Sequence, residues 1–216
     1  MRRLTFGLSA LATVSLIVAG LTAGDRLLDV GPAAEPDTVV EPVASAKKAK
    51  KREVMVIGSN WGGTAQVVDA RSHEVLKTLD IVPDRAQEKK SILTNPFRLV
   101  QYLAIQQVVG EGHDQLVDDL FTTRDGNLVA VSRPSYGDVV WIDMATNKIV
   151  AEQEMEGFRT DHMQVSPDGK RLLVSDSTKK KVHEYVLGGR GNPRTGKHLR
   201  SFPSGETPHE SNYIAG

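Results

Sequence analysis

Short apolar and β-branched runs, separated by polar turns, recur along the second half of the chain. Residues 127–135 read NLVAVSRPS and residues 136–145 read YGDVVWIDMA, with the turn dipeptide Asp125-Gly126 before the first run. Residues 117–124 add another run, VDDLFTTR. Apolar and β-branched runs of about four to eight residues between turn signals indicate short antiparallel strands. The pattern therefore predicts three consecutive strands in this stretch.

The same pattern returns 43 residues later. Residues 161–169 read DHMQVSPDG, so that Asp168-Gly169 takes the place of Asp125-Gly126, and the runs KRLLVSDST and KKVHEYVLG follow. A third copy begins over residues 208–216 as PHESNYIAG. A repeat of about 40–45 residues that holds four short strands is the period of a β-propeller blade.

Residues 53–82 hold three further strand-like runs, VMVIGSN, TAQVVDA and EVLKTLDIV, which match the last three strands of the repeat unit. We therefore predict an all-β fold made of β-propeller blades. It would hold three strands of one blade, two complete four-stranded blades and the first strand of another, which is a partial ring of about three blades. Because blades are stabilised by their neighbours, we expect the chain to be a truncated copy or fragment of a longer propeller.

Residues 83–112 break the strand pattern and predict a helical insertion after the first blade. Asn95 is suited to cap a helix that starts at Pro96, and Gly110 lies just beyond its end. Helical spacing groups Phe97, Val100, Ala104 and Val108, with Leu99 and Leu103 beside them, on one broad apolar face. We expect that face to pack over a rim of the propeller, as a packed decoration or as a lid.

The amino-terminal region is predicted to direct the protein out of the cytoplasm. Two arginines precede an apolar run over residues 4–21, which is the layout of a secretory signal and nearly long enough to cross a bilayer uncleaved. Residues 1–24 are therefore interpreted as a signal peptide or an amino-terminal anchor, residues 25–52 as a Pro-, Ala- and Lys-rich linker, and residues 53–216 as the propeller. Either interpretation makes the protein secreted or extracytoplasmic.

Composition removes several classes of function. The chain has 27 basic and 27 acidic residues, so no charge excess favours a nucleic acid, and its few aromatic residues are not interleaved with a basic stripe. It has no cysteine, which excludes thiol catalysis, disulfides and cysteine-bound zinc. No nucleophile elbow, phosphate loop or HExxH spacing occurs, so hydrolase and nucleotide-handling functions have little support.

Aligning the copies brings polar residues to equivalent positions where the first strand of each blade begins. Asp118-Asp119 lies opposite Asp161-His162, and His209-Glu210 takes this place in the third copy. In a propeller the first strand lines the central channel, so these residues are expected to surround one mouth of that channel. The loops between second and third strands open on the same side and contribute Trp61, Arg133 and Tyr136. This mouth is the candidate site.

The chain resembles the YVTN-repeat, YncE-like β-propellers, a WD40-like repeat family. The phrases VVDARSHEVLKTL, WIDMATNKIVAE and SPDGKRLLVSDS carry that resemblance. GEGHDQLVDDLFTTRDG, VSRPSYGDVVWIDM, TDHMQVSPDG and FPSGETPHE are similar to secreted actinobacterial and fungal propellers of this type. The resemblance covers residues 54–216 and implies a seven-bladed ring outside the cytoplasm. It implies no particular activity, because this fold hosts binding proteins, lyases and scaffolds.

Three uses of the mouth are compatible with its residues. A lyase that eliminates across a uronic acid-containing glycan needs an acid or base and a cation for the substrate carboxylate; the candidates are His113, His162, His209, Arg133 and Tyr136. A calcium ion would need hard oxygen ligands, which are available from Asp118, Asp119, Asp161 and Glu210. A binding protein without turnover would contact its ligand through Asp119, Asp161, Glu210 and Trp61.

Several of these residues also have a purely structural interpretation. Asp118 would cap its loop through backbone amides, Arg133 would tie down its own loop, and Trp61 would pack within a blade. Trp141 stands between Val and Ile on a third strand and is expected in the core between blades. Three other histidines are expected to be half-exposed surface residues: His73, His183 and His198.

Two classes of function therefore stay open. The first is a secreted binding or scaffold propeller that holds an unidentified ligand, with glycans among the candidates, at the channel mouth. The second is an extracellular polysaccharide lyase, so the sequence does not decide whether the protein is an enzyme. Binding is the main prediction, because fold analogy supplies no reaction. No cofactor other than calcium and no nucleic-acid partner are predicted, and membrane contact is expected only through residues 1–24.

Overall fold

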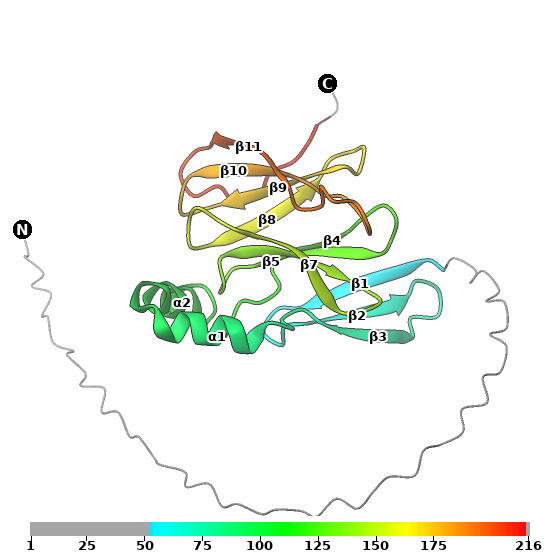
Figure 1. Ribbon diagram of the computed structural model, residues 1–216, viewed down its shortest axis with the longest axis horizontal. Helices are drawn as coiled ribbons and strands as arrows, with labels where there is room; N and C mark the ends of the chain where they lie inside the picture. Colours follow the sequence, from blue (N-terminus) through cyan, green and yellow to red (C-terminus); the bar gives the residue numbers. More distant parts are fainter. Residues whose placement is uncertain (1–51, 215–216) are drawn as a thin grey trace, which may run out of the picture. The chain divides into compact units, whose positions relative to one another are not determined.

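The computed structural model describes residues 52–214 as three antiparallel sheets that follow one another along the chain (Figure 1). In every sheet, strands that are adjacent in sequence are also hydrogen-bonded neighbours, which is the meander of a propeller blade. The predicted signal or anchor over residues 1–24 and nearly all of the predicted linker lie outside the described residues. Over residues 52–214, neither helix has the length and hydropathy needed to cross a bilayer.

The strands lie close to where the apolar runs predict them. Sheet one contains β1 (Val54–Ser59), β2 (Thr64–Asp69) and β3 (Val75–Asp80). Sheet two contains β4 (Leu120–Thr122), β5 (Leu128–Arg133), β6 (Asp138–Asp143) and β7 (Lys148–Glu154). Sheet three contains β8 (Thr160–Val165), β9 (Arg171–Asp176), β10 (Lys181–Val186) and β11 (His198–Pro203).

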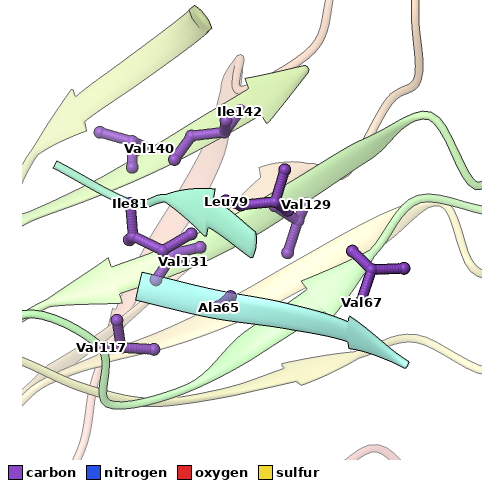
Figure 2. Packing of buried hydrophobic residues seen from close by; sticks show 9 residues of the cluster. All are labelled: Ala65, Val67, Leu79, Ile81, Val117, Val129, Val131, Val140 and Ile142. Atoms are coloured by element: carbon purple, nitrogen blue, oxygen red, sulfur yellow. The ribbon is translucent and has the colours of Figure 1, made fainter. Parts of the chain in front are cut away.

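Sheet two is buried on both faces because it packs between the other two sheets. One face meets sheet one through a cluster that Figure 2 shows: Ala65, Val67, Leu79, Ile81, Val117, Val129, Val131, Val140 and Ile142. The alternate residues of sheet two meet sheet three through another cluster: Ala130, Val139, Trp141, Met155, Met163, Leu172, Val174, Tyr185 and Leu187. Successive strand residues point to opposite faces, so every residue of β5 and β6 is buried.

The predicted fold class, a partial β-propeller with a helical insertion, is confirmed. The first strands β4 and β8 of sheets two and three contact each other, as inner strands do around a channel. Trp141 is fully buried between these two sheets, as expected, and its indole N–H donates to the carbonyl oxygen of Leu187 at 3.0 Å. Asp125 and Asp168 form equivalent turns, in which each carboxylate accepts the backbone N–H two residues later.

The insertion forms α1 (Arg85–Thr94) and α2 (Pro96–Val108), joined at Asn95. The predicted cap is confirmed, because the Asn95 side chain accepts hydrogen bonds from the backbone N–H groups of Phe97 and Arg98. The predicted apolar face is buried only in part. Phe97 is 71% exposed and Val108 82% exposed. The helix packs inward through Leu99, which the prediction included, and through Tyr102 and Ile105, which it did not.

A polar tether explains this orientation of α2. The Tyr102 hydroxyl donates to Asp114, and the Gln106 side-chain amide donates to the same carboxylate. These bonds hold the Tyr102 side of the helix against the loop that leads to sheet two. The apolar row through Phe97 consequently faces outward, although its spacing alone predicts burial.

The third copy of the repeat does not form its predicted strand within the described residues. Residues 208–214 carry no regular secondary structure. A first strand pairs with the second strand of its own blade, and no strand follows β11 within residues 52–214. The segment instead lies against sheet three, where the Ser211 hydroxyl is 3.2 Å from that of Ser175 and the Tyr213 hydroxyl donates to Glu184.

Candidate functional site

Backbone hydrogen bonds position the residues at the start of β4. The amide of Asp118 donates to the Ser132 carbonyl at the end of β5, and the amide of Asp119 donates to the Ser132 hydroxyl. The Ser132 amide in turn donates to the Asp119 carbonyl. These bonds hold the residues just before β4 beside the loop that joins β5 to β6. This is the side of the sheet on which the mouth is predicted.

One pocket gathers a residue from each of the three repeat copies. Asp119, His162 and Glu210 line a pocket of about 320 Å³, here called the mouth pocket. Its other lining residues are Phe121, Met163, Gln164, Ser211 and Asn212. Asp119 Oδ2 accepts the Met163 amide at 2.7 Å and lies 3.1 Å from His162 Nδ1. The repeat alignment therefore leads to residues that are adjacent in space.

A second group of side chains joins His162 at the edge of this pocket. The rings of His162 and His209 have centroids 4.2 Å apart, and His209 Nε2 lies 3.4 Å from Asp161 Oδ1. Asp161 is fully buried, and its Oδ2 is 3.0 Å from the Arg159 guanidinium. One ligand atom each of Asp161, His162 and His209 lies within 4.8 Å of the others.

The carboxylates around His162 raise its pKa. Partial burial acts to lower its pKa, but Asp118 and Asp119 outweigh this and raise the pKa of His162 above its ordinary value. Burial also raises the pKa of Asp118, and the nearby Asp161 carboxylate adds to that rise. Asp118 Oδ2 is buried without a hydrogen-bond partner, so the capping bonds expected for Asp118 are not made by that oxygen.

Arg133 does not lie on the mouth surface, which corrects that expectation. Its side chain is fully buried, and its guanidinium is paired with Asp138 at 2.5 Å and Asp84 at 2.7 Å. Both carboxylates bind it through two hydrogen bonds each, which leaves it no free edge for a ligand. Arg133 therefore anchors its own loop to the start of the helical insertion.

Tyr136 lies in a different pocket, beneath the helices. That pocket has a volume of about 150 Å³ and is also lined by Arg98, Gln101 and Tyr102 of α2. Burial raises the pKa of Tyr136 to about 12, and its hydroxyl has no hydrogen-bond partner. No residue lines both this pocket and the mouth pocket, so Tyr136 does not share a pocket with His162.

Trp61 and His113 form a separate pair on the first blade. Their rings stack with centroids 3.9 Å apart and planes 15° from parallel. Trp61 is 53% exposed, so the expectation that it packs within a blade is wrong. The neighbouring Asn60 side chain accepts the amides of Leu116 and Val117, which holds this turn beside the entrance of sheet two. Neither Trp61 nor His113 lines the mouth pocket.

The sequence interpretation also misplaced His183. It is buried, with Nδ1 2.8 Å from the Ser201 hydroxyl and Nε2 3.4 Å from Asp176, whereas a half-exposed position is expected from its strand. His73 and His198 are exposed. The remaining lining residues of the mouth pocket went unrecognised, although Met163 and Ser211 directly follow the residues that the repeat identifies.

Comparisons with known proteins assign no family. No protein-family model and no curated protein matches the chain. Similar solved structures include hydrazine synthase of Kuenenia stuttgartiensis, with a TM-score of 0.47 and 16% identity over 71% of this chain and 33% of that chain. Another is the periplasmic gluconolactonase PpgL of Pseudomonas aeruginosa, with a TM-score of 0.46 and 18% identity over 72% of this chain and 38% of that chain. This chain therefore spans between about a third and two fifths of the length of these proteins.

Proposed function

We propose that the chain is an extracytoplasmic, YncE-like β-propeller binding or scaffold protein that recognises a ligand at the mouth pocket. The observation that carries this function is the convergence of Asp119, His162 and Glu210, from successive repeat copies, on one cavity of about 320 Å³. A concave site with a few convergent polar groups is the usual form of a small-ligand site.

The lining of the mouth pocket favours a ligand rich in hydroxyl groups. Carboxylates accept hydrogen bonds from hydroxyls, and the side-chain amides of Gln164 and Asn212 both donate and accept them. Phe121 and Met163 supply apolar surface for the C–H face of a sugar ring. These groups together fit a neutral or amino-substituted glycan.

The same lining disfavours a uronic acid-containing glycan. None of the eight residues that line the pocket is an arginine or a lysine, whereas the elimination reaction needs a cation to neutralise the substrate carboxylate. Arg133, the predicted cation, is buried between Asp84 and Asp138. The lyase function is therefore the weaker alternative, and Arg133 and Tyr136 are left out of the proposed site.

Binding is tested with the full chain and a panel of neutral, amino-substituted and uronate oligosaccharides, followed by calorimetry. Asp119→Asn and Glu210→Gln are each expected to weaken binding about tenfold, because a hydrogen bond to a charged group contributes about 1.5–3 kcal/mol. Glu206→Gln is the matched control. Glu206 lies four residues before Glu210, but its side chain is 81% exposed and outside the pocket.

The outcomes separate the functions. Binding to neutral or amino-substituted glycans that depends on Asp119 and Glu210 supports the proposal. Equal binding by all variants, or no binding across the panel, contradicts it. Appearance of the unsaturated product from a uronate glycan, followed by its ultraviolet absorbance, would establish the lyase instead. Recovery of the protein from the medium or from washed membranes, rather than from cytosol, tests the proposed location.

A further inference from the structure

We propose that Asp161, His162 and His209 form a binding site for a first-row transition-metal dication, with Zn²⁺ the best match, at the edge of the mouth pocket. One ligand atom from each residue lies within 4.8 Å of the others. Two imidazoles and a carboxylate are the donor types that zinc takes in its open, three-residue sites. Asp161 and His162 are consecutive on β8, and His209 comes from the third repeat copy.

A fourth residue, Asp119, holds one of the three proposed ligands in place, as the residues behind the ligands of known metal sites do. Asp119 Oδ2 lies 3.1 Å from His162 Nδ1, which leaves Nε2 of that ring available to a metal. A carboxylate behind a ligating histidine fixes the orientation of the ring and raises its basicity. Asp119 in turn accepts the Met163 amide at 2.7 Å, so the carboxylate is itself held in place.

Buried oxygens without hydrogen bonds are an independent sign. Asp161 is fully buried, and its Oδ2 receives no hydrogen bond although Arg159 lies 3.0 Å away. Asp118, which aligns with Asp161 in the repeat, also has a buried Oδ2 without a hydrogen-bond partner. Unsatisfied buried carboxylate oxygens are costly, and a bound dication would offset that cost.

The geometry favours a transition metal over calcium. Calcium prefers six to eight oxygen ligands, whereas imidazole nitrogens suit zinc, copper, nickel and iron. The calcium set expected from sequence was Asp118, Asp119, Asp161 and Glu210, and the structure instead groups Asp161 with two histidines. Another acidic group, Asp84, Glu88 and Glu152, contains no histidine, so it lacks the nitrogen ligands that favour a transition metal.

A three-residue site leaves coordination positions for an outside ligand. The His209 side chain is 56% exposed, and His162 lines the pocket proposed for the glycan. Two adjacent hydroxyls of a sugar, or the carboxylate of a uronic acid, could occupy those positions. The absence of arginine and lysine from the pocket lining therefore disfavours a uronate glycan only when no metal is bound, and the uronate oligosaccharides are also tested with Zn²⁺ present. Coordination of a glycan by the metal rests on the proposed function, whereas the metal site itself does not need a glycan.

Metal binding is measured on the full chain without a histidine tag. Co²⁺ is added first, because its visible absorption reports nitrogen coordination, and Zn²⁺ is then added in competition. His162→Gln and His209→Gln are each expected to weaken Zn²⁺ binding by more than about 100-fold, and Asp119→Asn by about 10–100-fold. His73→Gln and His198→Gln are matched controls, because both histidines are exposed and outside the cluster. Zn²⁺ should also raise the Tm of the wild type and not that of His209→Gln.

Two results would overturn the proposal: Zn²⁺ affinity unchanged in His209→Gln, or Ca²⁺ binding as tightly as Zn²⁺. His209 is exposed, so its replacement should leave the fold intact, which circular dichroism verifies. The glycan panel is repeated with a chelator present. Glycan binding that persists there, with no Zn²⁺ binding, would refute the metal site alone. Zn²⁺ binding without glycan binding would refute the proposed function alone.

Discussion

Sheets two and three share a backbone pattern but place opposite chemistry at equivalent positions. In sheet two, Arg133 at the end of β5 pairs across the ladder with Asp138 at the start of β6. In sheet three, the equivalent pair is Asp176 opposite Lys181, with the signs of charge reversed. Arg133 is fully buried between two carboxylates, whereas the Lys181 side chain is 38% exposed and contacts Glu156.

The third strands of the two sheets, β6 and β10, also carry different buried residues at an equivalent position. Trp141 on β6 is buried between sheets two and three. The residue 43 positions later is Glu184 on β10, also buried, which binds Arg171, Arg200 and Tyr213. The repeat therefore specifies strands, turns and burial, while the chemistry of each buried position depends on which segment covers it.

Removing the buried cation of sheet two is expected to cause the largest loss of stability. Arg133→Met would leave the Asp138 and Asp84 carboxylates without their counter-charge, and breaking a buried pair in this way costs about 3–5 kcal/mol. The free energy of unfolding is measured by urea denaturation followed by circular dichroism. The expected result is a fall of that size.

Lys181→Met is the matched control for Arg133→Met. Lys181 is in the equivalent hairpin of sheet three, but its ion pair with Glu156 joins side chains that are 38% and 50% exposed. Such pairs contribute about 0–1 kcal/mol. Equal losses of stability in the two variants would contradict the distinction between a buried ion pair in sheet two and an exposed ion pair in sheet three.

An intermediate effect is expected at Trp141. Trp141→Phe removes the donor to the buried Leu187 carbonyl and leaves part of the indole volume empty, because Gly196 and Tyr185 pack on the ring. The lost hydrogen bond and the cavity together are expected to lower the free energy of unfolding by about 2 kcal/mol. Urea denaturation checks this, and a neutral result would show that sheets two and three do not pack tightly at this point.

Local signals and the repeat period were sufficient to predict most of the fold. Asp125-Gly126 and Asn95 make the turn and the cap that their residue types favour. The mouth pocket also followed from sequence, because equivalent positions of successive blades are placed around a common axis. Asp119, His162 and Glu210 are therefore close although they are distant in the chain.

The predictions of burial and orientation that were wrong concern residues whose environment depends on contacts between non-equivalent segments of the chain. Arg133 is buried because Asp84, 49 residues earlier, lies at the start of the insertion. The orientation of α2 depends on Asp114. Neither partner recurs with the repeat, so neither periodicity nor residue type could reveal them. The burial of His183 is a different case, because Val140 is buried at the equivalent position 43 residues earlier and the repeat therefore does predict it.

Apart from the Lys181→Met control, the smallest loss of stability is expected at Glu184, the counterpart of Trp141. Glu184→Gln keeps the shape of the side chain and weakens its bonds to Arg200 and Tyr213, which should cost about 1 kcal/mol near neutral pH. Burial acts to raise the pKa of Glu184, but those two partners outweigh burial and lower it. A lowered pKa adds stability above the unfolded value of about 4.3, and that stability disappears as pH falls through the folded value. The stability difference between wild type and Glu184→Gln, measured by urea denaturation across this range, should therefore shrink as pH falls. A difference that is independent of pH would mean that the carboxylate charge does not stabilise this face.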